Sequence, residues 1–138
     1  MLSRENTGRM NSLIIPATYN TPAVSFDPAG ELTIMGRSIT TRALAFYGPL
    51  LEWLGDYSVN PAPLTILNLD FEILHVDSLA RVMNICQLLA QLNRAGYNAA
   101  INWYCQKNDE DMRDMAGMVS ELLKSIQINE ILVETDAA

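Results

Sequence analysis

Hydrophobic and polar residues alternate in two short runs near the beginning of the chain, at residues 23–26 and 31–34. Between these runs lies Asp27-Pro28-Ala29-Gly30, in which proline presets φ and glycine supplies a positive φ. Alternation on both sides of such a turn predicts a β-hairpin over residues 23–35.

Residues 43–57 show a different pattern, because their apolar side chains recur at the spacing of one helical face. Thr40 and Thr41 precede this stretch, and either of them can cap a helix. Pro49 lies inside it and cannot donate a backbone hydrogen bond. We therefore predict an amphipathic helix that Pro49 bends or divides.

Three more strands are predicted in the rest of the chain. Residues 64–71 alternate strictly between apolar and polar side chains, and further strands are expected at 99–104 and 131–133. Helical stretches connect these three strands, so they should run parallel to one another. The whole order predicts one α/β domain, with an N-terminal β-hairpin plus three parallel strands in a mixed sheet and three main helices.

Two of these helices lie between the later strands. The first begins at Asp77 or Ser78, either of which can cap it, and Gly96 ends it. The second opens within residues 108–111, and Met118 lies off its apolar stripe as a candidate for an adaptable recognition surface. The stripe predicted to be buried consists of Met112, Met115, Ala116, Val119, Leu122, Leu123 and Ile126.

Length and composition change this picture only at the amino terminus. The chain has 138 residues, of which 49% are hydrophobic, and this is the size of one domain with one core. Residues 1–12 are polar and aperiodic and predict a flexible tail, which leaves 13–138 as the folded domain. No apolar run approaches the length of a membrane span, and no signal peptide is recognised, so a cytoplasmic protein is expected.

The net charge of −7 argues against a nucleic-acid ligand, which requires clustered Lys and Arg. No glycine-rich phosphate loop is present, and Cys86 and Cys105 lack the spacing of a zinc site. We expect two buried, reduced thiols and no cofactor. Asp109, Glu110 and Asp111 lack the pattern of a calcium loop, so stabilisation of a helix start is favoured over a cation site.

Catalysis has one candidate group. His75 is the only histidine, and with Asp77 and Ser78 it supplies the residue types of a hydrolytic triad. Neighbours in sequence rarely converge in that way, and no GxSxG elbow is present. A small hydrolase-like enzyme using these residues is therefore an alternative, and a polar connection with a helix cap is the favoured interpretation.

Several motifs in sequence order resemble one bacterial family, the SiaC-type regulatory phosphoproteins, whose fold is similar to that of STAS anti-sigma-factor antagonists. The resemblance runs from about Thr21 to Glu134. Its carriers are Thr21-Pro22 with Phe26-Asp27-Pro28, Gly36-Arg37-Ser38, Phe46-Tyr47-Gly48-Pro49-Leu50-Leu51-Glu52-Trp53-Leu54, Ile101-Asn102-Trp103-Tyr104 and Asp109-Glu110-Asp111-Met112.

The resemblance implies a non-enzymatic protein that is switched by phosphorylation at the start of the helix after the central strand. A dedicated kinase would add the phosphate, and a PP2C-type phosphatase would remove it. In the family's best-known system the unphosphorylated form binds and activates a diguanylate cyclase, which connects it to cyclic di-GMP and biofilm formation. A phosphate adds charge and acceptor oxygens, and so would block docking by repulsion and desolvation.

This chain departs from the family pattern at the switch. Where the family usually has Asn-Thr-Ser-Ser, the chain has His75-Val76-Asp77-Ser78, so Val76 stands where the modified threonine would be. Valine has no hydroxyl. Three hypotheses remain: Ser78 accepts the phosphate, Asp77 supplies a fixed negative charge, or regulation by phosphate is lost and partner binding is constitutive.

We expect the partner-binding surface to include polar positions on this helix. Its predicted members are His75, Asp77, Ser78, Arg81 and Asn84. The expected partners are proteins, namely a diguanylate cyclase, a kinase and a phosphatase. A structural subunit of an acidic complex is a further alternative.

Overall fold

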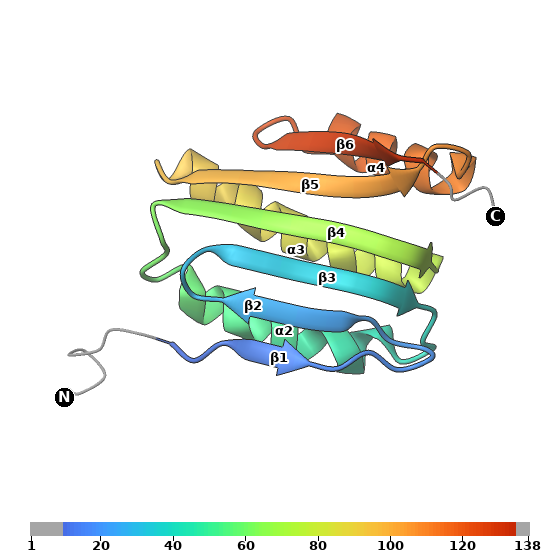
Figure 1. Ribbon diagram of the computed structural model, residues 1–138. Coiled ribbons are helices and arrows are strands. Elements are labelled where there is room, and N and C mark those ends of the chain that lie inside the picture. The colour runs from blue at the N-terminus through green and yellow to red at the C-terminus, as the bar shows by residue number, and fades with distance from the viewer. Residues whose placement is uncertain (1–9, 135–138) are drawn as a thin grey trace.

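The computed structural model describes residues 10–134 and has one six-stranded sheet with helices on one of its faces (Figure 1). The strands are β1 (Leu13–Ile15), β2 (Ala23–Asp27), β3 (Glu31–Ser38), β4 (Leu64–Leu74), β5 (Asn98–Gln106) and β6 (Gln127–Val133). The helices are α2 (Ala43–Tyr57), α3 (Val76–Arg94) and α4 (Glu110–Leu122). None of the helices within residues 10–134 has the length and apolar character needed to cross a membrane.

The strands lie in the sheet in the same order as in the chain, from β1 to β6. The predicted hairpin is confirmed, with antiparallel pairing from Asp27↔Glu31 to Ala23↔Met35. Strands β3, β4, β5 and β6 are parallel, so the parallel part includes one strand more than predicted, because α2 is also a crossover. Right-handed crossovers that all proceed in one direction place their helices on the same face, which leaves the other face uncovered (Figure 1).

Strand β1 was not predicted, because three residues are too few to show a period. It pairs antiparallel with β2 from Leu13↔Phe26 to Ile15↔Val24 and forms one edge of the sheet. Met10 packs half-buried against the core, and the carbonyl of Asn11 accepts a hydrogen bond of 2.9 Å from Trp53 Nε1. These residues of the predicted tail therefore contact the domain, whereas residues 1–9 lie outside the described part of the chain.

The core lies between the sheet and the helices. Alternate residues of each central strand point into it, and the opposite residues face the uncovered side, as the period-two pattern predicted. Cys86 and Cys105 are buried free thiols, which confirms that expectation. Burial raises the pKa of Cys86 to about 12.

Two details of the helices bear on the predictions. Helix α2 is not divided at Pro49, so a bend is the part of that prediction that stays a prediction. Pro49 lies on the exposed side of the helix together with Ala45, the residue whose carbonyl loses its donor. Water can bind that carbonyl, so the helix continues. Helix α4 ends at Leu122, which is exposed, so Leu123 and Ile126 of the predicted stripe lie beyond the helix.

Candidate functional site

Helix α3 begins directly at the carboxyl end of β4, and its start is fixed by His75. The amide of His75 donates to the carbonyl of Ser38 at 2.9 Å, and Nδ1 of its side chain accepts from the amide of Asp77 at 3.4 Å. His75 is therefore the N-cap, and the prediction that Asp77 or Ser78 caps this helix is wrong, because the helix begins earlier. Asp77 lies in the first turn, where its carboxylate interacts favourably with the helix dipole.

Beneath this start lies a cluster of three buried hydroxyl groups from three elements. Ser78 is 0% exposed, and its Oγ accepts a hydrogen bond of 2.8 Å from Oγ of Ser38. Oγ of Ser38 also lies 2.7 Å from the hydroxyl of Tyr47 on α2. Burial raises the pKa of Tyr47 to about 12, so the cluster is uncharged at neutral pH. These bonds tie α3 to β3 and α2.

The possible triad is not assembled. His75 Nδ1 lies 4.0 Å from Oδ2 of Asp77, but the same nitrogen accepts a hydrogen bond from the backbone amide of Asp77 as part of the helix cap. Ser78 points inward to Ser38, and within residues 10–134 no hydrogen bond joins it to His75. A nucleophile needs contact with its base and with substrate, and Ser78 has neither.

The outer surface of the same segment has a different character. Val76 is 66% exposed, and it lines a shallow groove of about 370 Å³ between α3 and α4, called here the α3–α4 groove. Met118 enters from α4 and is 44% exposed. The lining residues are Val76, Leu79, Ala80, Arg81, Met83, Asn84, Gln87 and Met118.

The α3–α4 groove includes some of the residues predicted for the partner-binding surface, and it includes further residues that were not predicted. Arg81 and Asn84 are half-buried at the groove, and the amide of Asn84 donates to the side chain of Gln87 at 3.2 Å. Met83 and Gln87 also line the groove, and neither belongs to the surface predicted from the sequence. The signal was present, because Val76, Ala80, Met83 and Gln87 recur at three- and four-residue spacing along one face of α3.

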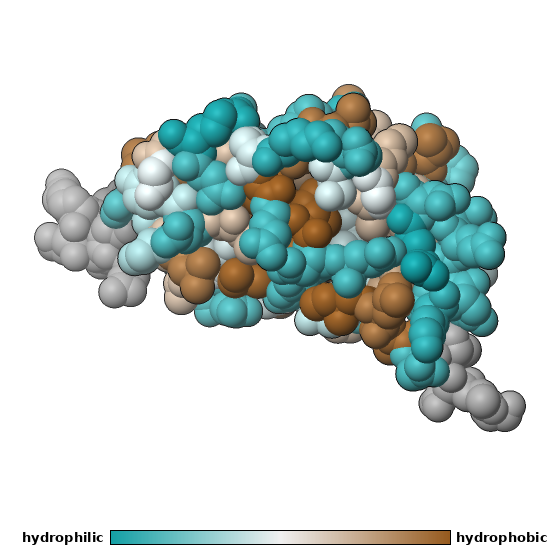
Figure 2. All heavy atoms as spheres, turned by 90° about the horizontal axis from the view of Figure 1, so that it is seen from above, coloured by the Kyte–Doolittle hydropathy of each residue, from teal (hydrophilic) through white to brown (hydrophobic). Residues whose placement is uncertain are grey.

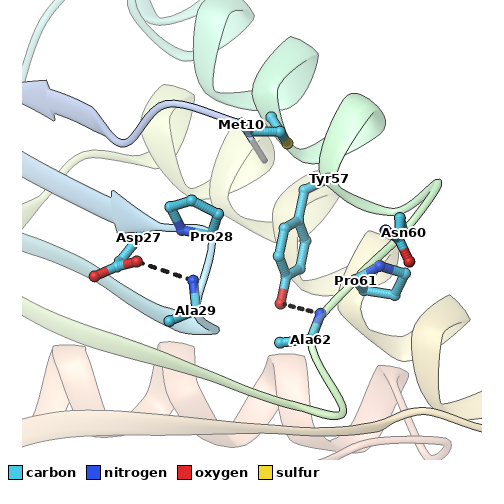
Figure 3. A pocket seen from close by; sticks show the side chains of 8 residues that line it. All are labelled: Met10, Asp27, Pro28, Ala29, Tyr57, Asn60, Pro61 and Ala62. Carbon is cyan, nitrogen blue, oxygen red and sulfur yellow. Dashed lines mark hydrogen bonds between the residues drawn. The ribbon is translucent and has the colours of Figure 1, made fainter. Parts of the chain in front are cut away.

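A second pocket, of about 250 Å³, lies at the opposite end of the sheet (Figure 3). The carboxylate of Asp27 there accepts from the amide of Ala29 at 2.9 Å. The hydroxyl of Tyr57 accepts from the amide of Ala62 at 3.1 Å and bonds to Thr65 at 2.7 Å. Because these polar groups already stabilise a turn and a loop, this pocket is a weaker candidate for function.

Acidic residues at the start of α4 also have a structural role. The carboxylate of Asp109 accepts from the amide of Met112 at 3.1 Å and caps the helix, while Glu110 and Asp111 lie in its first turn. Within residues 10–134 no group of three or more His, Cys, Asp or Glu side chains is arranged to hold a metal ion. The cap and the first-turn carboxylates stabilise the helix start, which is the role that the sequence favoured for Asp109, Glu110 and Asp111.

Solved structures similar to this one include SiaC structures from Pseudomonas aeruginosa. Apo-SiaC from Pseudomonas aeruginosa is 24% identical in sequence, with a TM-score of 0.80 over 88% of this chain and 99% of that chain. A chain in the complex of the diguanylate cyclase SiaD with its activator SiaC, from the same organism, is also 24% identical, with a TM-score of 0.81 over 88% of this chain and 99% of that chain. At this identity the likeness establishes the shared fold.

Sequence similarity identifies the family. No curated protein shows significant similarity to the chain. Residues 15–133, however, match the family described as SiaC family regulatory phosphoprotein, and this range includes β2 to β6, all three helices and the α3–α4 groove. The chain therefore belongs to the SiaC family of regulatory phosphoproteins.

Proposed function

We propose that this protein regulates a diguanylate cyclase by binding it through the α3–α4 groove and the exposed first turn of α3. The observation that carries the proposal is an exposed apolar groove with a polar rim beside a rigidly held helix start. The SiaC structure in which a diguanylate cyclase is bound to its activator supports the choice of partner. The protein would act by binding and would have no catalytic activity of its own.

The groove has the composition of a protein-binding site. Val76 and Met118 offer apolar surface that water covers in the free protein, and their burial by a partner would be favourable. Asp77, Arg81 and Asn84 surround this surface with charged and polar groups that can select the partner's orientation. The hydroxyl cluster beneath it holds α3 in place before binding, which reduces the entropy lost on association.

The same segment argues for binding that does not depend on phosphate. Val76 is accessible but has no hydroxyl, whereas Ser78 has a hydroxyl that is fully buried. A kinase and a PP2C-type phosphatase, which the family resemblance implies, therefore have no accessible hydroxyl among these positions. Of the three hypotheses for the switch, we favour constitutive binding. Asp77 then serves to stabilise the start of α3.

The test uses the full chain and a diguanylate cyclase of the same organism. Calorimetry would measure the dissociation constant, and synthesis of cyclic di-GMP would measure activation. Val76→Arg is expected to weaken binding by at least about tenfold, because it places a charge in the apolar part of the contact. The matched control is Leu44→Arg, a change at an exposed apolar position on α2 that is 67% exposed.

Equal effects of the two variants, or none, would refute the assignment of the surface. Failure of the unchanged protein to bind the cyclase would refute the choice of partner. The form purified from its own host should carry no phosphate on residues 75–81, as measured by intact mass and fragmentation. A phosphate on Ser78 would contradict constitutive binding and would require that α3 opens at its start.

A further inference from the structure

The face of the sheet turned toward the viewer in Figure 1 carries no helix. Its central row is polar and internally satisfied. The side-chain amide of Asn102 donates to Asn68 at 3.1 Å, and that of Asn129 donates to Asn102 at 3.0 Å. The polar side chains of this row bond to one another, so they are less available to a partner than other groups on the same face.

A groove of about 400 Å³ lies at the carboxyl ends of the central strands, and we call it the strand-end groove. Met35, which is 49% exposed, Tyr104 and Val133 provide apolar and aromatic walls from three strands. Asp70 and Glu72 provide two carboxylates from β4. The groove is lined by Met35, Gly36, Asp70, Phe71, Glu72, Tyr104, Cys105, Gln106 and Val133.

The two carboxylates differ in their partners. Glu72 lies 3.4 Å from Arg37, whose guanidinium also donates to the carbonyl of Tyr19 at 3.0 Å and lies over the Tyr19 ring. The carboxylate of Asp70 has no hydrogen bond or ion pair within residues 10–134, although its backbone lies opposite Met35 in the sheet. Burial raises the pKa of Asp70, which means that its carboxylate is partly removed from water without a compensating cation.

Charge on the uncovered face is also one-sided. Asp27, Glu31, Asp70 and Glu72 lie on its strands, and the cation among them, Arg37, is engaged with Glu72 and Tyr19. The apolar and aromatic residues of the strand-end groove include Met35, Tyr104 and Val133, so recognition there combines limited apolar contact with charge. Figure 2 views a different side of the molecule, from above β6 and α4, where hydrophobic groups are separated by hydrophilic ones.

We propose that the strand-end groove receives an arginine side chain of a partner protein, with its alkyl part against Met35 and Val133, its plane beside Tyr104 and its guanidinium on Asp70. Arginine fits better than lysine, because a planar guanidinium both stacks on an aromatic ring and pairs with a carboxylate through two hydrogen bonds. The surface is separate from the α3–α4 groove and goes beyond the function proposed above.

The test is a nuclear magnetic resonance titration of the full chain with N-acetyl-arginine methylamide. Amide signals of Met35, Asp70, Tyr104 and Val133 are expected to shift together. N-acetyl-citrulline methylamide has the same shape without the charge, and it should bind at least about tenfold more weakly, since a charged hydrogen-bond pair is lost. The lysine analogue should also bind more weakly than the arginine compound.

Two variants complete the test. Asp70→Asn keeps the size of the side chain and should reduce affinity for the arginine compound by at least about tenfold. Asp56→Asn removes the same charge from an exposed position on α2 and should leave the affinity unchanged. The spectra of both variants verify that the fold is retained. Equal binding of citrulline, equal loss in both variants, or shifts spread over many acidic residues would overturn the proposal. The cyclase test with Val76→Arg does not involve this groove, so the two proposals can fail separately.

Discussion

Helix α2 holds two buried tyrosines, Tyr47 and Tyr57, at opposite ends of the sheet, and their hydroxyls bond to different parts of the fold. At the carboxyl end, the hydroxyl of Tyr47 bonds to Ser38, which bonds to Ser78 at the start of α3. At the amino end, the hydroxyl of Tyr57 bonds to Thr65 on β4 and accepts from the backbone of Ala62. One tyrosine therefore supports a helix start, and the other supports a loop.

The difference separates a functional end from a structural one. The groups supported by Tyr57 complete their hydrogen bonds within the loop and its neighbouring strand (Figure 3). Tyr47 supports a segment whose inner side is satisfied but whose outer side, at Val76, is apolar and exposed. A rigid base under an unpartnered surface is the arrangement expected for docking with little reorganisation.

The largest effect is expected for Ser78→Asp, which would place a charge in the hydroxyl cluster of Ser38, Tyr47 and Ser78. We expect the free energy of unfolding to fall by at least about 3 kcal/mol, because an unpaired buried charge has no solvation there. Val76→Asp introduces the same carboxylate at an exposed position two residues earlier, at the helix start. It should change the free energy of unfolding by about 0.5 kcal/mol or less. Urea unfolding measures both. Similar losses in the two variants would show that Ser78 is not buried in solution.

The second largest effect is expected from alkaline pH, which should lower the free energy of unfolding through the hydroxyl of Tyr47. The pKa of Tyr47 is raised to about 12 in the folded protein by burial, whereas a tyrosine in the unfolded chain titrates near about 10. Between these values the unfolded state loses a proton that the folded state keeps, so stability falls as pH rises, by about 1 kcal/mol per pH unit. Tyr47→Phe should make this decline shallower.

Cys86 and Cys105 also have raised pKa values, about 12 through burial and about 11 through burial with Glu130 adding to it. Their contribution remains in both proteins, so the difference between the wild type and Tyr47→Phe isolates the tyrosine. Denaturation curves collected from pH 9 to 11 would give that difference. Parallel pH dependences would argue that Tyr47 ionises freely while folded.

At neutral pH the comparison can be sharpened by removing each hydroxyl. Tyr57→Phe should cost about 2 kcal/mol, because it leaves the hydroxyl of Thr65 and the amide of Ala62 short of a partner. Tyr47→Phe should cost about 1 kcal/mol, because Ser38 keeps its bond to Ser78. Urea unfolding of the pair gives the order, and a larger loss for Tyr47→Phe would reverse the proposed division of roles.

The smallest effect on stability is expected for Val76→Thr, within about 0.5 kcal/mol, since the side chain is exposed and similar in size. It would return a hydroxyl to the position where the family resemblance expects the phosphate. When the variant is expressed with a kinase of that pathway, we expect phosphate on residue 76, located by fragmentation mass spectrometry. Phosphate on Ser78 in the wild type or in Val76→Thr would contradict the argument that burial keeps this hydroxyl from the kinase.

Most of the fold was predictable because its long strands and helices have clear periods. Residues 64–71 alternate for a full strand, and they form the first part of β4, which continues to Leu74. Strand β1 was not predictable from pattern, because its three residues become a strand only by pairing with β2. The unbroken α2 likewise depends on where Pro49 faces, which is set by packing of the opposite side of the helix.

The site was predictable in part. The segment that begins at His75 stands out as the start of a helix after a strand, and it does line the candidate surface. The burial of Ser78 depends on Ser38, which is 40 residues away in the chain. The contribution of Met118 depends on how α4 lies beside α3. Contacts between distant elements are not contained in local periodicity, so sequence analysis named the segment without separating its inner side from its outer side.

Because the strands lie in chain order, the sheet can assemble in the direction of protein synthesis. The β2–β3 hairpin needs only local contacts, and each later strand joins the one made just before it once its crossover helix has formed. A nascent chain that has not yet reached β6 would present β5 as an open edge, with Asn102 and Tyr104 still without the neighbours that β6 supplies. Release of the last strand from the ribosome would therefore be the step that covers β5 and leaves β6 as the edge of the finished sheet.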